Sequence, residues 1–277
     1  MNRLRKVGWV AVMRARQQLL CWRSAAVFIL MGIFMFSYAQ PFSDFARERG
    51  LEITPYAAVF IMDDIIAQLF LMLGAVALCA GAPFLDEQYP YLVARCGRCT
   101  VVLGNILAIL GLTGLYVAFL YLASVAPMAD TLAWDHRWGK VWNTLALSHP
   151  HVEGSMIAVS DAIRSSLTPR RALLIGLLLE WGCAGGLGLV VYWGNRLSGK
   201  PLGLWIAAGF VMLDTTIYNI LPASLQRYSP LSLARLSVYK NRLITFSYGY
   251  GGCFLVGMAL ALSAVLLIQE RLKKDLV

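Results

Sequence analysis

The chain has 277 residues, of which 59% are hydrophobic and 14% charged, and its mean hydropathy is +0.65. So few charged side chains cannot cover the surface of a water-soluble domain, and the composition excludes an ordinary soluble protein. Contact of Lys and Arg with anionic lipid headgroups explains the net charge of +9 without any nucleic acid partner. We therefore predict an integral membrane protein with a single transmembrane domain over residues 1–277.

Residues 1–23 combine six basic side chains with scattered apolar ones. Arg14 and Arg16 interrupt the apolar residues and no small-residue cleavage site follows, so the segment lacks the pattern of a signal peptide. We predict an amphipathic helix that lies on the membrane surface, with a flexible basic tail as the alternative. The apolar residues expected on one side of this helix are Trp9, Val10, Met13 and Leu20.

Six apolar runs are long enough to cross a bilayer, whose hydrocarbon core of about 30 Å needs about 20 residues of helix. They occupy residues 24–41, 58–82, 101–126, 172–194, 202–220 and 244–269. These runs do not alternate apolar and polar residues as a membrane β-strand does, so each favours a helix. The predicted fold class is therefore all-α, with six transmembrane helices.

The distribution of Lys and Arg predicts the orientation of these helices. If both termini are cytoplasmic, the inside segments hold 13 of the 24 basic residues. Because the inside segments are shorter in total than the outside ones, their density of positive charge is higher, as is typical of cytoplasmic loops. The sequence thus predicts a multi-pass protein of the cytoplasmic membrane. The predicted inside segments are residues 1–23, 83–100, 195–201 and 270–277.

The longest segment outside the predicted membrane helices, residues 127–171, is expected to be external. Its Trp134, Trp138 and Trp142 are spaced by four residues, which would place three indoles on one face of a helix. Trp side chains favour the boundary between membrane and water. We therefore expect an external helix before the fourth transmembrane helix.

Several motifs that suggest chemistry lack the context that the chemistry needs. Residues 194–200 match the G-x-x-x-x-G-K core of a phosphate-binding loop, but they join two predicted helices and precede Pro201 instead of Ser or Thr. Cys96 and Cys99 have the spacing of a zinc pair, but all three histidines lie in the predicted external segment. We predict no catalytic residue and no metal site. Four glycines indicate close helix packing instead: Gly182, Gly185, Gly186 and Gly188.

Four acidic residues fall inside predicted transmembrane helices: Asp63, Asp64, Glu180 and Asp214. An unpaired charge near the bilayer centre costs about 2.5 to 3.5 kcal/mol, so these side chains should not face lipid. At about 1.5 Å per residue, Glu180 and Asp214 both lie about 12 Å from the outer ends of their helices, and no basic residue within the helices neutralises them. One hypothesis is that the four acids line an acidic outward cavity on the path of a cationic or amphipathic substrate. The alternative is that they cap a broken helix or bond to the backbone, to Thr215, to Thr216 or to Asn219.

The segment 83–100, between the second and third predicted helices, combines charged and apolar side chains. Three elements follow one another here: Asp86-Glu87-Gln88, Ala94-Arg95-Cys96-Gly97-Arg98 and Leu103-Gly104-Asn105. The segment resembles the coupling-helix loop of permease subunits of type-2 ABC exporters, in which an acidic start precedes a small-residue and Arg element and then a Leu-Gly-Lys step. Asn105 replaces the Lys. The resemblance extends to the basic N-terminal helix, the six helices, the internal termini and the sequence Tyr228-Ser229-Pro230, which implies an external helix before the sixth membrane helix.

This resemblance implies a short cytoplasmic coupling helix between the second and third membrane helices. Such a helix lays apolar side chains into a groove of a partner, while charged side chains fix its register. Tyr89, Tyr91, Leu92 and Val93 would fill the groove. The residues expected to couple the chain to an ATPase are Asp86, Glu87, Gln88, Tyr89, Tyr91, Leu92, Arg95, Gly97 and Arg98.

The resemblance also implies that the chain is not itself an enzyme. Separate cytoplasmic ABC ATPase subunits would bind ATP and Mg, and this chain would hold no cofactor. The permease would pair with a second copy or a related permease, contact membrane lipid, and export an amphipathic, drug-like, lipid or peptide substrate. Two other classes remain open: a membrane-embedded enzyme that uses the intramembrane carboxylates, and a non-transporting scaffold or sensor subunit.

Overall fold

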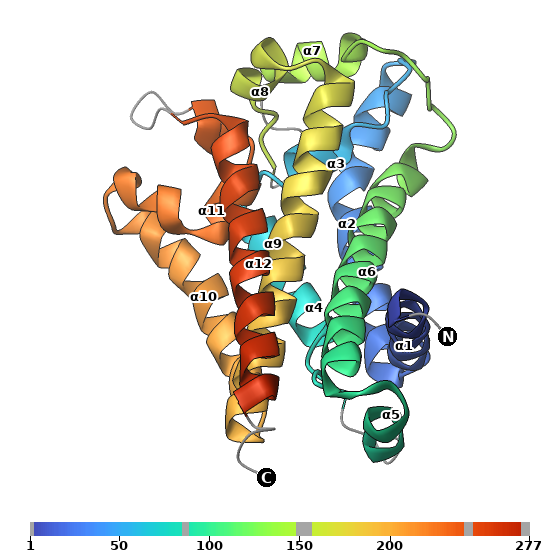
Figure 1. Cartoon of the computed structure of the whole chain (residues 1–277). Helices are drawn as coiled ribbons and strands as arrows, with labels where there is room; N and C mark the ends of the chain where they lie inside the picture. Colours follow the sequence, from blue (N-terminus) through green and yellow to red (C-terminus); the bar gives the residue numbers. More distant parts are fainter. Residues whose placement is uncertain (1–2, 85–88, 148–156, 241–245, 273–277) are drawn as a thin grey trace.

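The computed structural model describes residues 3–84, 89–147, 157–240 and 246–272, which form helices joined by loops (Figure 1). Within these residues, four helices that run along the length of the molecule are long and apolar enough to cross a membrane. They are α2 (Trp22–Glu48), α6 (Arg98–Val125), α9 (Pro169–Ser198) and α12 (Tyr248–Leu272). The prediction of an all-α membrane protein is thereby confirmed.

The second predicted membrane helix, residues 58–82, is broken in the structure. After α3 (Ala57–Ile61) the chain turns, and α4 (Ile65–Leu78) begins with Asp64 as its N-cap. The Asp64 carboxylate accepts hydrogen bonds of 3.0 and 2.9 Å from two backbone N–H groups in the first turn of α4. These bonds satisfy donors that have no partner within the helix, which stabilises a helix start at this position. The prediction of one continuous helix is therefore wrong here.

The other predicted membrane helices correspond to single helices with shifted ends. The fifth, residues 202–220, corresponds to α10 (Leu202–Asn219). The largest shift is at the end of the first, which was expected at residue 41 but extends to Glu48 with Pro41 inside the helix. α10 and the shorter apolar helix α4 are not among the four helices that meet the length and composition of a membrane span.

The N-terminal segment forms α1 (Arg3–Leu19), which packs against α6, so the alternative of a flexible tail is wrong (Figure 1). Val10 is fully buried, and a Cβ added at Gly104 of α6 would lie 2.5 Å from the Val10 side chain. The buried face differs from the predicted one, because Leu20 lies beyond the helix and is 77% exposed. The buried residues of α1 are Val7, Val10, Arg14 and Gln18.

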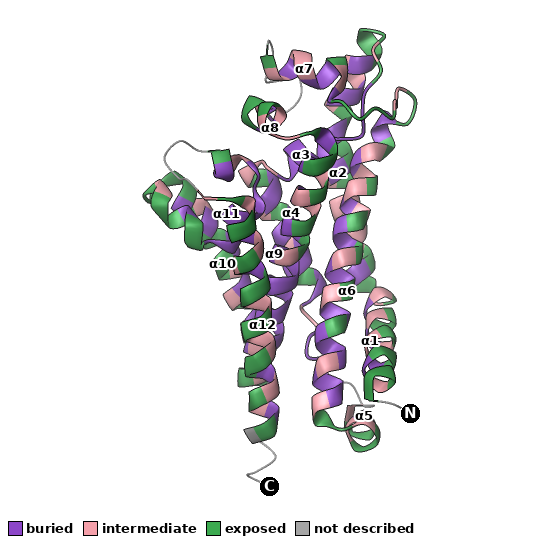
Figure 2. Cartoon of the chain, turned by 45° about the horizontal axis from the view of Figure 1, so that its top comes forward, coloured by how far each residue is buried: buried purple, intermediate pink, exposed green. Residues whose placement is uncertain are grey.

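α9 is the central helix of the bundle (Figure 2). In its most apolar stretch 67% of the residues are buried, against 17% in α2 and in α12, whose outer faces are exposed. Its glycines allow this close packing: an added Cβ would lie 2.0 Å from Met258 at Gly186 and 2.7 Å from Ile109 at Gly188. The prediction that the glycines of this helix serve close packing is confirmed.

α9 and α10 cross at a contact between two glycines. A Cβ at Gly194 would lie 2.5 Å from the Cα atom of Gly203, and a Cβ at Gly203 would lie 2.1 Å from the Val191 carbonyl oxygen. Beside this contact, the Asn195 amide donates to the Ala82 carbonyl (2.7 Å), and its oxygen accepts from the Gly203 N–H (2.8 Å). The segment that resembles a phosphate-binding loop is therefore a packed helix hairpin.

Short helices lie at both ends of the bundle (Figure 1). α5 (Tyr89–Cys96) lies at the same end as α1 and the C-terminus, while α7 (Gly139–Leu147) and α8 (Asp161–Ser166) lie at the opposite end. Helical elements therefore precede both α9 and α12, as predicted. Those before α12 are η2 (Ala223–Tyr228), α11 (Pro230–Ala234) and η3 (Ser237–Lys240).

The three tryptophans of the predicted external helix do not share one helical face. Trp134 precedes α7 and is 77% exposed, whereas Trp142 lies within α7 and is fully buried. The indole N–H of Trp142 donates to the Thr54 carbonyl (3.1 Å), and that of Trp138 to the Leu167 carbonyl (3.0 Å). The prediction fails because the helix begins at Gly139, whose φ of +76° interrupts the spacing.

The glycine contact between α9 and α10 predicts a sharp difference between two substitutions in the same helix. Gly203→Ala forces a backbone shift and should lower the free energy of unfolding by about 1–3 kcal/mol, as overpacking does. Gly209→Ala is the control, because an added Cβ there has no atom within 4 Å. Thermal unfolding of the detergent-solubilised protein measures both, and equal melting temperatures would contradict the contact.

Candidate functional site

A buried ion pair joins α10 to the segment before α12. The Asp214 side chain in α10 is 3% exposed and that of Arg235, directly after α11, is 1% exposed. Arg235 Nη2 donates to Asp214 Oδ2 at 2.9 Å. The hydroxyls of Ser229 and Ser232 both donate to Asp214 Oδ1. The carboxylate therefore has a cation on one oxygen and two hydroxyl donors on the other, which offsets its removal from solvent.

The local sequence explains how Arg235 reaches this position. Ser229 caps α11 by accepting the N–H of Ser232, and Pro230 occupies the first helical position, where its missing N–H costs nothing. The five residues of α11 are all buried, so the segment enters the bundle beside α9 and α10. Asp214 is therefore neutralised, although no basic residue lies within the predicted membrane helices. The cation comes from a segment that was expected to be external.

Glu180 of α9 is completely buried, and neither of its carboxylate oxygens has a hydrogen-bond partner among the described residues. Gln68 of α4 is its polar neighbour. The Gln68 amide donates to the Leu231 carbonyl of α11 at 2.9 Å, and within the described part of the chain its own oxygen has no donor. Gln68 thus lies between Glu180 and the α11 segment, which also precedes Arg235, the partner of Asp214.

We refer to this group of side chains as the Arg235 cluster. It comprises polar residues from α4, α9, α10 and the α11 segment, at a level of the bundle where an apolar interior is the norm. Its members are Gln68, Glu180, Asp214, Ser229, Ser232 and Arg235.

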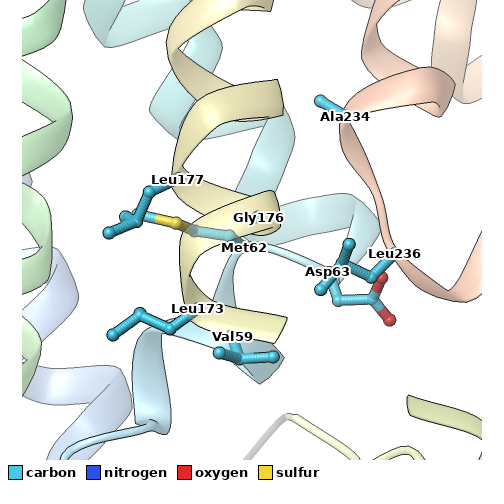
Figure 3. A pocket seen from close by; sticks show the side chains of 8 residues that line it. All are labelled: Val59, Met62, Asp63, Leu173, Gly176, Leu177, Ala234 and Leu236. Carbon is cyan, nitrogen blue, oxygen red and sulfur yellow. The ribbon is translucent and has the colours of Figure 1, made fainter. Parts of the chain in front are cut away.

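Asp63 lies at the edge of this cluster and Asp64 outside it. Asp63 Oδ1 accepts the backbone N–H of Ser237 at 2.8 Å, and Arg235 attracts it electrostatically. In Figure 3, Asp63 and Leu236 line a pocket opposite residues of α9. The pocket has a volume of about 10 Å³, which is room for about one water molecule. Asp64 is occupied as the N-cap of α4.

Within the described residues, Glu180 and Asp214 are buried in the packed bundle and do not face an open cavity. The alternative holds in part, since Asp64 caps a broken helix and Asp63 bonds to the backbone. Thr216 and Asn219 bond to carbonyls of their own helix instead of to the acids. A larger hollow of about 300 Å³ lies near the C-terminal end of α6 and the N-terminal end of α9, and its lining includes Tyr56, Tyr121, Trp134, His136 and Arg170 but not the four acids.

The second predicted site lies at α5, at the opposite end of α9. The Arg196 guanidinium of α9 donates to the Tyr89 hydroxyl of α5 at 3.3 Å and forms an ion pair with Glu270 of α12. Lys6 of α1 donates to the Arg95 carbonyl at 3.4 Å. Side chains therefore link α5 directly to α1 and α9, and through Arg196 to α12. In the sequence, the only sign of the Arg196–Glu270 pair is that Glu270 directly follows the last apolar run.

The predicted coupling residues have different environments. Leu92 is 7% exposed and faces its own chain, so the expectation that it fills a partner's groove is not met. Tyr91 is 78% exposed, Arg95 and Arg98 are exposed, and Tyr89 is half-buried. Gly97 has a φ of +85°, which only glycine adopts readily, at the turn between α5 and α6. Asp86, Glu87 and Gln88 lie outside the described residues.

Among the residues that the structure describes, no group of three or more His, Cys, Asp or Glu side chains is arranged to hold a metal ion. Comparisons with protein-family models, curated proteins and solved structures find no match to this chain.

The buried ion pair predicts a large effect of removing its cation. Arg235→Met leaves the Asp214 charge without its partner, so the free energy of unfolding should fall by about 3–5 kcal/mol. Arg47→Met is the control, because the Arg47–Asp130 pair is 45% and 75% exposed and such pairs contribute about 0–1 kcal/mol. Thermal unfolding in detergent measures both variants. A similar small loss in both would show that the buried pair is dispensable.

Proposed function

We propose that this chain is the transmembrane permease subunit of an ATP-driven exporter of the type-2 ABC class. In this proposal the broken helix α3–α4 and α10 complete a set of six membrane passages, and α1, α5 and both termini face the cytoplasm. The membrane character of the chain, the basic α1 and the common end shared by α1, α5 and the C-terminus support it (Figure 1).

The observation that carries this proposal is the set of contacts made by α5. A motor outside the membrane moves membrane helices by pushing on a projection that is attached to them. α5 presents exposed Tyr91 outward, while Tyr89 contacts Arg196, which is paired in turn with Glu270. A force on α5 would therefore reach α9 and α12 through direct contacts. An ordinary connecting loop needs neither the exposed aromatic residue nor these links.

In this proposal, ATP and Mg bind to separate cytoplasmic ATPase subunits, and the permease works as a dimer with itself or a related chain. The substrate is amphipathic, drug-like, lipid or peptide. A membrane-embedded enzyme and a scaffold or sensor subunit are the rival classes. An enzyme would need a reactive group open to a substrate, whereas the Arg235 cluster is buried. A scaffold would show no dependence on ATP.

The proposed topology places α5 in the cytoplasm, and thiol labelling tests this. In a variant that keeps Cys96 as its single cysteine, an impermeant reagent should label the protein only after the cells are made permeable. The matched control is a cysteine at Lys140, which is exposed on α7 at the opposite end and should be labelled in intact cells. Labelling of Cys96 in intact cells would reverse the topology.

The proposed coupling role predicts different effects of substitutions on the two faces of α5. Tyr91→Ser removes an exposed aromatic side chain and should weaken co-purification of the ATPase, since burying such a side chain contributes about 1.5–3 kcal/mol. Tyr89→Phe removes only the hydroxyl that contacts Arg196, so association should persist while substrate-stimulated ATP hydrolysis falls.

Leu4→Ser is the control for this experiment, because Leu4 is 86% exposed on α1 at the same end of the molecule. It should leave both co-purification and hydrolysis unchanged. If Tyr91→Ser also leaves both unchanged, α5 is not the contact with an ATPase.

A further inference from the structure

The hollow between the C-terminal end of α6 and the N-terminal end of α9 is separate from both sites described above. Its volume of about 300 Å³ falls at the lower end of the range of ligand pockets, which is about 300–1,000 Å³. Charged and aromatic side chains line one part of it, and leucines of α9 line another. It therefore has room for a small polar group with an apolar group attached.

The hollow is lined by one guanidinium and one carboxylate that do not pair with each other. Within the described residues, Arg170 forms no ion pair, and its one polar contact is His136, whose Nε2 lies 3.4 Å from Arg170 Nη2. Asp135 Oδ1 accepts the backbone N–H groups of His136 (2.6 Å) and Arg137 (3.3 Å). In the same part of the chain, no cation lies within ion-pair distance of this carboxylate. Both charges are thus available to a bound molecule.

Both charges are held on a defined framework. The Tyr56 side chain belongs to a residue that is 5% exposed, and its hydroxyl donates to the Asp135 carbonyl at 3.0 Å. This bond attaches the loop that carries Asp135 to the start of α3. Arg170 is the second residue of α9. Asp135 also borders a neighbouring hollow together with Lys140, but the described residues show no ion pair between the two.

Arg170 lies at the level that lipid headgroups would occupy along α9. The helix has 30 residues and a length of about 45 Å, and a bilayer with its headgroup regions measures about 40–45 Å. Trp134, which lines the same hollow, is 77% exposed, and Trp side chains favour this boundary. Basic pockets between membrane helices bind lipid headgroups. A lipid phosphate is therefore a suitable partner for Arg170.

Apolar side chains on α9 form a track that leads from the hollow toward the middle of the helix. Leu174 lines the hollow, and Leu178 and Trp181 follow on the same face of the helix. These three side chains are 61%, 52% and 39% exposed. The Trp181 indole donates to the Leu110 carbonyl of α6 at 2.8 Å, so the two helices are joined where the track ends. An acyl chain attached to a headgroup in the hollow would lie along this track.

We propose that the hollow binds the headgroup of a zwitterionic phospholipid, one that carries both a phosphate and an ammonium group. Arg170 donates to the phosphate oxygens, Asp135 accepts from the ammonium group, and one acyl chain lies along the track on α9. An anionic headgroup would meet the Asp135 carboxylate, and a cationic one would meet the Arg170 guanidinium. Only a group with both charges satisfies both side chains. The site stands whether or not an ATPase drives the protein.

Native mass spectrometry of the delipidated full chain in detergent measures the binding. The probes are phosphatidylethanolamine and phosphatidylglycerol with the same acyl chains. The chain should bind one phosphatidylethanolamine at least about tenfold more tightly, since only this lipid carries the ammonium group. Glycerophosphoethanolamine, which has the headgroup without acyl chains, should not displace it. Equal binding of the two lipids, or displacement by this soluble compound at equal concentration, would overturn the proposal. This comparison needs no variant.

Two substitutions separate the two charges. Arg170→Gln should weaken binding of phosphatidylethanolamine about tenfold, because it removes the cation beside the phosphate. Asp135→Asn should abolish the preference over phosphatidylglycerol, and its amide oxygen can still accept the two backbone N–H groups of the loop. Both residues are exposed, so both variants should melt at the temperature of the parent.

Arg171→Gln is the matched control, because Arg171 is exposed in the same turn of α9 but does not line the hollow. It makes the same change of charge and should leave the affinity for phosphatidylethanolamine unchanged. Equal losses in Arg170→Gln and Arg171→Gln would mean that only the general surface charge attracts lipid, and the proposal would then be wrong. A preference for phosphatidylethanolamine that survives Asp135→Asn would also contradict it.

Discussion

The ion pair between Arg235 and Asp214 fixes the arrangement of the part of the bundle that contains α11. It ties the α11 segment to α10, and two serine hydroxyls complete the coordination of the carboxylate. Without the pair, the apolar residues of α11 would still favour burial, but α10 would carry an uncompensated charge among apolar helices. The entry of α11 in turn brings the Leu231 carbonyl to Gln68 and places Ser237 against Asp63. One pair thus determines the partners of two acids, Asp214 and Asp63, and of Gln68.

α9 connects the Arg235 cluster to the opposite end of the molecule. It carries Glu180 in the Arg235 cluster and Arg196 beside α5, about 24 Å apart at 1.5 Å per residue. Its glycines let α6, α10 and α12 approach closely, so a displacement of α9 displaces its neighbours as well. In the proposed function, α9 is the element through which a push on α5 reaches the buried acids.

Much of the fold follows from the sequence. Long apolar runs without alternating polarity satisfy their backbone hydrogen bonds in a membrane by forming helices. The close packing at the α9 glycines was also predictable, since four small residues fell within one such run. The hydropathy pattern does not show the break at Asp64. Hydropathy is averaged over many residues, whereas an N-cap depends on hydrogen bonds to only a few backbone N–H groups. The entry of Arg235 was missed for a different reason: it lies outside the apolar runs, and only the tertiary packing of α11 brings it to Asp214.

α5 shows the same difference between what the sequence pattern predicts and what only tertiary packing decides. The sequence predicted that Tyr89 and Leu92 fill a partner's groove, but it could not show that both side chains turn toward the chain itself. The central claim of the account is that α5 transmits force from an ATPase. Purification of the full chain in mild detergent, with identification and quantification of every co-purifying chain, tests this claim most directly. The account predicts a cytoplasmic ATPase in stoichiometric amount, and a preparation that contains this chain without any ATPase would contradict it.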